Sequence, residues 1–291
     1  YYENGVLEIE TFYRNGKLEG IWKDYSKDGK IENETSFKNG IEDGTKKTFY
    51  KNGNLKYSVE IKNGIKDGVF KQYYENGVLE IEAFYKNDKL EGVKRDYYKS
   101  GKIENETSFK NGIEDGTKKS FYKNGNVKIE WTIVNGAQNG VAKSYYEDGT
   151  LKSDSIFKNN KKTGIEKMYS FDGKLVAEVP YKDEIRDGIE KQYSKNGKII
   201  IEISFKNGIE DGDFKQYYEN GVLEIEAFYK NGKLEGIRKD YYKSGKLEVE
   251  GLQKNGEPDG WTYVYNEDGS LKREILFIEG KAYEKDNNKK K

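Results

Sequence analysis

Glycine recurs along this chain with a fixed step of 24 residues, and this period constrains the fold more than any other feature. Three such series hold 32 of the 33 glycines. Two series are unbroken, one from Gly20 to Gly260 and one from Gly5 to Gly269. The third runs from Gly16 to Gly280 with three substitutes, Asp88, Asn160 and Glu184. A period without insertions predicts a tandem array of one short structural unit.

One unit consists of two alternating strands and two turns, as in GTKKTFYKNGNLKYSVEIKNGIKDG at residues 44–68. Asn-Gly and Asp-Gly between alternating runs are strong hairpin signals, because Asn and Gly accept a positive φ. The segment KNGIEDG occurs at 38–44, 110–116 and 206–212, and we predict that it connects successive hairpins. The alternation places Leu55, Tyr57, Val59 and Ile61 on one face of the second strand.

The first turn of each unit decides which apolar side chains share a face. The position of Phe49 is aromatic in all twelve units, and that of Leu55 is Leu, Ile or Val in all twelve. A two-residue loop at Asn52-Gly53 would put these side chains on opposite faces. A three-residue loop, with Gly53 left-handed as a bulge, would put them together. We predict the bulged turn because two consistently apolar positions should pack together.

Composition bounds the fold class. Hydrophobic residues make up 34% of the chain and charged residues 36%, which is too polar for a thick core. The 25 Tyr and 13 Phe argue against disorder. We predict an all-β, elongated, single-layer twisted antiparallel sheet of about twelve 24-residue β-hairpin repeats over residues 1–283, without long helices. Residues 284–291 form a charged C-terminal tail.

The charges exclude several functions. Lys plus Arg equals Asp plus Glu, 52 each, and the signs alternate, so there is no basic stripe for a nucleic acid. No apolar run is long enough for a transmembrane segment. One strand position is acidic in eleven of twelve units, and a matching position is basic. Such ladders predict paired strands, whereas catalysis needs a unique carboxylate pair. We therefore expect no catalytic residue and no enzyme.

Metal and cofactor sites are also not expected. The chain has no Cys and no His. Asn39, Glu42 and Asp43 supply oxygen atoms, but Ca²⁺ takes six to eight ligands and no single loop offers them. A phosphate cradle needs a helix N-terminus after the glycines, and no stretch has helical periodicity. The interpretation of these loops as turns is the simpler one.

The aromatic side chains are the candidate binding residues. Each unit has two adjacent aromatic positions, and if the first packs inward the second points outward. A long exposed aromatic row would mark a contact surface. The alternative is that Lys side chains cover the rings and the row only stiffens the sheet. The candidate partner-binding residues are Tyr50, Tyr74, Tyr98, Tyr122, Tyr146, Phe70 and Phe84. Ser26, Ser170, Ser194 and Asn266 interrupt the row.

The repeated pattern, with DG before a K.YY.NG.L hairpin and E..F.KNG after it, resembles the MORN-repeat-variant proteins of bacteria over the whole chain. The resemblance implies a sheet built hairpin by hairpin. Some members of that family are labelled antitoxins of toxin–antitoxin systems, and eukaryotic MORN arrays resemble membrane-apposed scaffolds. The resemblance carries no catalytic motif.

Three functions remain open from the sequence. The first is a protein–protein interaction scaffold, with an antitoxin or immunity protein that covers a toxin as one form. The second is a secreted or cell-surface adhesin that binds a host or surface protein. The third is a membrane-apposed lipid-binding scaffold, which the balanced charge disfavours. The location is open, with export or the cell surface favoured over the cytoplasm. Open sheet edges also permit self-association.

Overall fold

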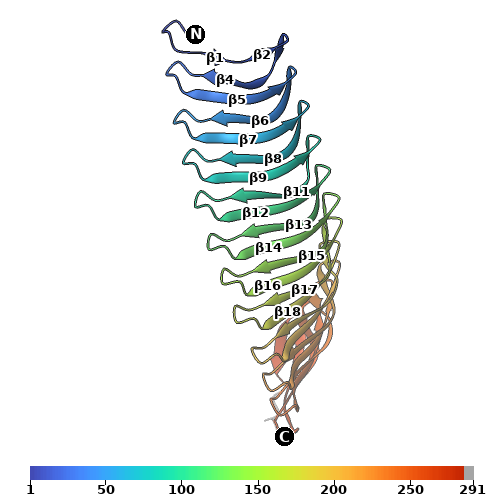
Figure 1. Ribbon diagram of the computed structural model, residues 1–291. Coiled ribbons are helices and arrows are strands. Elements are labelled where there is room, and N and C mark those ends of the chain that lie inside the picture. The colour runs from blue at the N-terminus through green and yellow to red at the C-terminus, as the bar shows by residue number, and fades with distance from the viewer. Residues whose placement is uncertain (285–291) are drawn as a thin grey trace, which may run out of the picture. The chain divides into compact units, whose positions relative to one another are not determined.

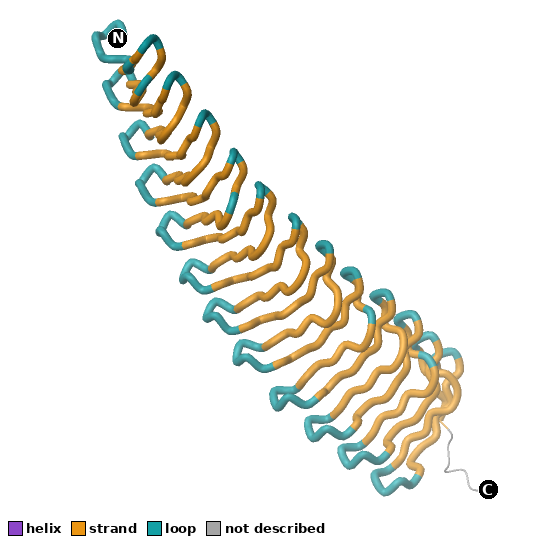
Figure 2. Tube along the Cα trace, turned by 45° about the vertical axis from the view of Figure 1, so that its right-hand side comes forward, coloured by secondary structure: helices purple, strands orange, loops and turns teal. Residues whose placement is uncertain are grey.

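The computed structural model describes residues 1–284, which contain 29 strands and no helix. The all-β prediction is therefore confirmed for the described part of the chain. The chain divides into two compact units, residues 1–149 and residues from 150 onward, and each is described by itself. Within each unit the strands form a single layer and run antiparallel to their neighbours (Figure 1, Figure 2). Residues 285–291 of the predicted tail lie outside the described residues.

The first unit contains fifteen strands. The short β2 and β3 pair only with each other, and β1 pairs with β4. The strands are β1 (Ile9–Glu10), β2 (Tyr13–Arg14), β3 (Lys17–Leu18), β4 (Gly20–Tyr25), β5 (Ile31–Lys38), β6 (Ile41–Phe49), β7 (Leu55–Lys62), β8 (Ile65–Tyr73), β9 (Leu79–Lys86), β10 (Lys89–Leu90), β11 (Gly92–Tyr97), β12 (Ile103–Lys110), β13 (Ile113–Phe121), β14 (Val127–Val134) and β15 (Ala137–Tyr145).

The second unit repeats this arrangement with fourteen strands. The strands are β16 (Leu151–Lys158), β17 (Lys161–Tyr169), β18 (Leu175–Lys182), β19 (Ile185–Arg186), β20 (Gly188–Tyr193), β21 (Ile199–Lys206), β22 (Ile209–Tyr217), β23 (Leu223–Lys230), β24 (Lys233–Leu234), β25 (Gly236–Tyr241), β26 (Leu247–Lys254), β27 (Glu257–Tyr265), β28 (Leu271–Ile278) and β29 (Lys281–Glu284).

The turn between β6 and β7 is the predicted three-residue bulged loop. The Gly53 amide donates to the Tyr50 carbonyl at 2.8 Å, and Gly53 has a φ of +88°. The Tyr50 amide donates to the Asn54 carbonyl at 2.8 Å and closes the loop. Phe49 then pairs directly with Leu55, so their side chains share a face as predicted.

The segment KNGIEDG connects successive hairpins, as predicted, and it also joins neighbouring turns. In the turn between β7 and β8, Asn63 and Gly64 have φ values of +50° and +82°, which is the two-residue hairpin turn. The Gly64 amide donates at 2.8 Å to the carbonyl of Glu42, which lies at the start of β6 just after the preceding turn. The Asn63 amide donates to the Asp43 carboxylate at 3.2 Å. The acidic residue of the segment therefore accepts a hydrogen bond from the next turn.

The strand after the bulged turn corrects one prediction. Thr48 pairs with Tyr57, whereas the adjacent Phe49 pairs with Leu55, so Lys56 is an extra residue in β7. Neighbours in a strand face opposite sides, and a bulge breaks this alternation in the strand that contains the extra residue. Leu55 therefore lies on the face of Phe49, and Tyr57 and Val59 lie on the other. The prediction that Leu55, Tyr57, Val59 and Ile61 share one face was wrong for Leu55.

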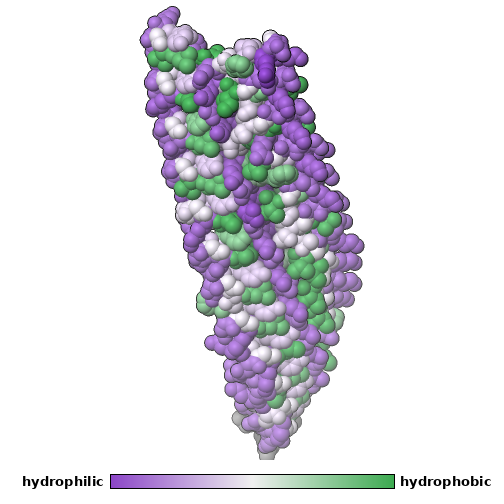
Figure 3. Space-filling model, in the orientation of Figure 1, coloured by the Kyte–Doolittle hydropathy of each residue, from purple (hydrophilic) through white to green (hydrophobic). Residues whose placement is uncertain are grey.

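The two faces of the sheet differ in burial. We call the face of Tyr57 the core face, because the most buried side chains belong to it: Thr35, Val59, Ile61, Ala83, Thr107, Ile133, Ser155, Val179 and Ala227. We call the face of Phe49 the ladder face, because it carries the acidic and basic ladders. Polar and apolar side chains are interspersed along the side seen in Figure 3. A single layer thus buries only part of its apolar surface.

Candidate functional site

Acidic and basic strands alternate on the ladder face, as the sequence predicts. Lys23 pairs with Glu10 on one side and Glu34 on the other, and the same pattern continues in both units. Arg95 contacts two acids, with Nε 2.8 Å from Glu106 and a guanidinium nitrogen 3.8 Å from Glu82. Each pair is partly exposed and contributes only tenths of a kcal/mol to about 1 kcal/mol. The acidic and basic side chains of the ladders therefore neutralise one another, and no carboxylate pair differs from the others.

The aromatic residues of the ladder face are bound to the acidic ladder. The Tyr193 hydroxyl donates to Glu178 at 2.8 Å, and the Tyr217 hydroxyl donates to Glu202 at 2.9 Å. Burial, and then the hydrogen bond to the carboxylate, raises the pKa of both Tyr193 and Tyr217 to about 12. These tyrosines stay protonated at neutral pH and act as donors that hold neighbouring strands together.

Large apolar side chains remain exposed on the ladder face. In the first unit, Val69 pairs with Phe84, whose side chain is 42% exposed. The Phe84 carbonyl accepts from Glu91, which precedes the strand that carries Val93. In the second unit the exposed set comprises Ile156, Ile165, Ile189, Phe228, Ile237, Leu252 and Trp261. Sequence reasoning found Phe84 but considered only aromatic side chains at that position. It missed Ile165, Ile189 and Ile237, at the position of Val69, because the bulge that decides their face is not visible in the alternation.

The tyrosine row consists of the positions equivalent to Tyr50 in all repeats. Its candidate binding residues, Tyr50, Tyr74, Tyr98, Tyr122 and Tyr146, lie on the core face and are half-buried. The Tyr50 side chain lies beside Lys56, whose Nζ is 5.8 Å from the ring centroid. The expectation that this row points away from the packed side was wrong, because the bulge exchanges the faces. Whether the row binds a partner stays a prediction.

Hydroxyl groups of the row join successive hairpins. The Tyr50 hydroxyl donates to the Tyr73 carbonyl at 2.7 Å, and the Tyr98 hydroxyl donates to the Phe121 carbonyl at 2.8 Å. The same bond, always 23 residues apart, is made by Tyr2, Tyr74, Tyr122, Tyr218 and Tyr242. These tyrosines therefore have a structural role wherever the bond is made, in addition to any role in binding.

The two predicted phenylalanines do not belong to one surface. Phe70 pairs with Ala83 on the core face and lies between Tyr57 and Tyr85, with ring centroids 6.3 and 6.0 Å away. Phe84 lies on the ladder face. A partner could not contact both with one flat surface, so the predicted set splits into a core-face row and a ladder-face residue.

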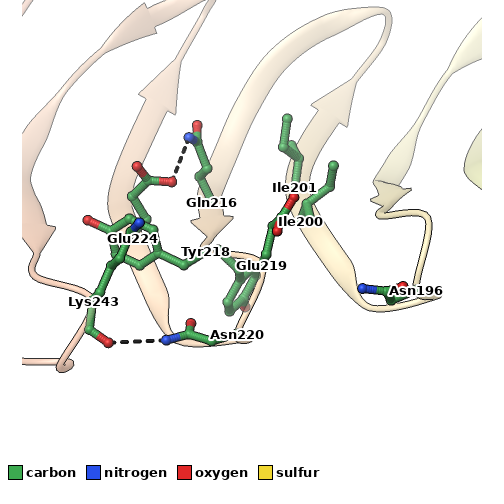
Figure 4. A pocket seen from close by; sticks show the side chains of 10 residues that line it. Asn196, Ile200, Ile201, Gln216, Tyr218, Glu219, Asn220, Glu224 and Lys243 are labelled. Carbon is green, nitrogen blue, oxygen red and sulfur yellow. Dashed lines mark hydrogen bonds between the residues drawn. The ribbon is translucent and has the colours of Figure 1, made fainter.

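Shallow hollows accompany the tyrosine row. One of about 560 Å³ is lined by Tyr74 and Tyr98 with Lys99, Ser100, Lys102 and Lys123. Lys99 places its Nζ 5.8 Å from the Tyr74 ring centroid. A larger hollow of about 740 Å³ lies beside Tyr218 in the second unit (Figure 4). Both are open hollows on the face that carries the row.

Residues 1–284 contain no group of three or more acidic residues placed to hold a metal ion. No helix with the length and apolar character of a membrane span occurs in the described part of the chain.

Comparison with known proteins identifies the repeat. The sequence matches the MORN repeat variant family over residues 1–15, 18–39, 42–63, 66–87, 90–111, 114–135, 138–159, 162–183, 186–207, 210–231 and 234–255. MORN repeats in general bind proteins or membranes and are not enzymes. A comparison with curated proteins found no significant match.

Among solved structures, the chain has a likeness to alternansucrase in complex with isomaltononaose, at 16% identity. The match covers 94% of this chain and 18% of the alternansucrase chain, with a TM-score of 0.20. That score is too low for any argument about fold or function. The family match covers eleven repeats and most of the sequence. The chain therefore belongs to the MORN repeat variant family.

Proposed function

We propose that this chain is a non-enzymatic scaffold that binds a protein partner through the ladder face. The observation that carries the proposal is the set of exposed apolar side chains that lie beside the acid–base pairs of the ladders. Phe84 is 42% exposed, Phe228 39% and Ile237 55%. Apolar side chains gathered on one exposed face are typical of interaction surfaces, and aromatic residues dominate their binding energy.

Charge favours a protein over a lipid or a nucleic acid. The formal net charge is zero, and the ladder pairs acids with bases along the strands. Such a face has little attraction for anionic membranes or phosphate backbones. It suits a partner surface that is apolar at its centre and of mixed charge around it.

The tyrosine row is a second contact surface in the proposal. Its rings are half-buried, with lysines beside them, and the hollow between Tyr74 and Tyr98 could receive a protruding side chain of the partner. Because the row lies on the opposite face from Phe84, the two surfaces can be tested separately.

The test compares three baits in affinity capture, followed by calorimetry on the captured protein. They are the wild type, Phe84→Ser/Phe228→Ser for the ladder face, and Tyr98→Ser for the row. Ser already occupies the Phe84 position in other repeats, at Ser36, Ser108 and Ser204, so the double variant should fold. We expect the double variant to lose a specific partner, with affinity at least about tenfold weaker.

Equal binding by the wild type and the double variant would refute the ladder face. Loss with Tyr98→Ser alone, in a protein with an unchanged circular dichroism spectrum, would assign binding to the row. Co-sedimentation with anionic vesicles would instead favour the lipid-binding scaffold. The finer hypotheses, an antitoxin or immunity protein and a cell-surface adhesin, differ only in whether the partner is a toxin or a host or surface protein. The identity of the captured partner decides between them.

A further inference from the structure

The hollow beside Tyr218 occupies a place that a tyrosine ring fills in other repeats. Where the row has a tyrosine, its hydroxyl reaches the carbonyl 23 residues further on. At residue 194 the row has a serine, and the equivalent carbonyl is that of Tyr217. The Ser194 hydroxyl accepts instead from the Lys198 amide of its own turn, at 3.3 Å. No tyrosyl group of the row therefore reaches Tyr217.

The lining residues show that this is the place of the absent ring. The hollow measures about 740 Å³ and extends from Asn196, Ile200 and Ile201 to Gln216 and Tyr218. A shift of 144 residues maps these five onto Asn52, Lys56, Tyr57, Gln72 and Tyr74. The Tyr50 side chain lies among these positions: its ring is beside Lys56, and its hydroxyl donates to the carbonyl of Tyr73, the residue between Gln72 and Tyr74. The hollow is the counterpart of an occupied tyrosine position.

Another interruption of the row gives the same result. A hollow of about 530 Å³ is lined by Ser26 and by the next tyrosine, Tyr50. An opening on the core face thus accompanies the missing ring at both Ser26 and Ser194.

The hollow at Ser194 has an apolar wall, which suits an aromatic ligand. Its upstream strand contributes two adjacent isoleucines, Ile200 and Ile201, both half-buried. The hollow at Ser26 has Glu32 and Asn33 in the same places. In Figure 4 the isoleucines lie on β21 and Tyr218 directly follows the neighbouring β22, with Gln216 bonded to Glu224 at 2.9 Å. Apolar walls contribute burial, and a backbone carbonyl contributes an acceptor.

We infer that the Ser194 hollow is a binding site for a phenolic side chain, supplied by a tyrosine of a partner polypeptide. The ring would lie between Ile200, Ile201 and Tyr218, and its hydroxyl would donate to the Tyr217 carbonyl. The sheet itself makes this contact wherever the row has a tyrosine. The inference names one contact of the proposed protein-binding function and rests on it, but the site lies on the core face, away from Phe84 and Phe228.

The experiment titrates methyl-labelled protein with N-acetyl-tyrosinamide and, separately, N-acetyl-phenylalaninamide. We expect saturable shifts of the Ile200 and Ile201 methyl signals with the tyrosine probe. The phenylalanine probe should bind about 3- to 10-fold more weakly, because it lacks the hydroxyl donor. Ser194→Tyr, which fills the hollow from within, should abolish the shifts. Ser194→Ala, which leaves the hollow open, should keep them.

Three results would overturn the inference: no saturable shift in the wild type, equal binding of the two probes, or unchanged binding in a folded Ser194→Tyr variant. The probe is a small molecule, and the capture assay of the ladder face does not involve residue 194. Failure of the probe therefore counts against this site alone, whereas failure of the Phe84→Ser/Phe228→Ser comparison counts against the proposed function.

Discussion

Replacement of Gly116 by alanine tests whether KNGIEDG contains glycine for backbone reasons. Gly116 ends one copy of the segment and has a φ of +115°, where a side chain is strained. An added Cβ would lie 2.9 Å from the Ser108 Cβ of the paired strand β12. Gly92 is the matched control in the preceding repeat, since its φ is +76° and no atom lies within 4 Å of an added Cβ.

The expected magnitudes follow from these two geometries. A left-handed alanine costs about 1–2 kcal/mol at either position. Crowding against Ser108 adds about 1–3 kcal/mol at Gly116 only. We therefore expect Gly92→Ala to lower the free energy of unfolding by about 1–2 kcal/mol and Gly116→Ala by about 2–5 kcal/mol.

The assay is native-state hydrogen exchange combined with urea unfolding, because the stability of a repeat array is the sum of local terms. Faster exchange should centre on β12 and β13 in Gly116→Ala. In that variant, Ser108→Gly removes the obstructing Cβ and should restore part of the loss, apart from about 0.5–1 kcal/mol for glycine in a strand. Equal costs for Gly92→Ala and Gly116→Ala, or no rescue by Ser108→Gly, would refute the steric argument.

Three further predictions concern the tyrosines. Tyr98→Phe removes the hydroxyl bond to the Phe121 carbonyl and should destabilise the protein by about 0.5–1.5 kcal/mol in urea unfolding. Ser194→Tyr should restore the missing bond and raise the urea midpoint by a comparable free energy; a lower midpoint would contradict the assigned ring position. The pKa of Tyr193 and Tyr217 is raised to about 12 from an unfolded value of about 10, so between these pH values the folded state binds more protons. Stability should therefore fall as pH rises from about 10 to 12, and Tyr193→Phe should flatten this dependence.

The period and the turn chemistry made most of the local fold predictable. The Asn-Gly turns were assigned from residue type, because few residues accept a positive φ, and the length of the Gly53 loop was inferred from the consistently apolar positions of Phe49 and Leu55. The charge ladders were predicted from the same repeat period, and Lys71 and Glu82 lie opposite each other as expected. Both predictions depend on turn-forming residues and on the spacing of charges, and both of these can be read from the sequence.

The choice of faces was not predictable from alternation. Lys56 sits at an ordinary position in the pattern, yet it is the extra residue that moves Leu55 to the ladder face. A single bulge inverts every assignment beyond it, because the side-chain period is two. The tyrosine row was therefore expected on the exposed side, and its hydroxyl bonds to the next hairpin were not foreseen. The acidic and basic positions predicted which residues of neighbouring strands lie opposite each other, but no feature of the sequence indicated the bulge.

Repetition also limits where a specific binding site can form. A contact that every unit offers equally gives a partner several equivalent registers, so it contributes affinity but not a unique position. Uniqueness must come from units that depart from the consensus. Ser194 with Ile200 is one such departure, and Phe84 and Phe228, where three other repeats have serine, are another. The regular positions maintain the sheet through their hydroxyl and charge pairs, and the exceptions are where a partner can distinguish one repeat from the next.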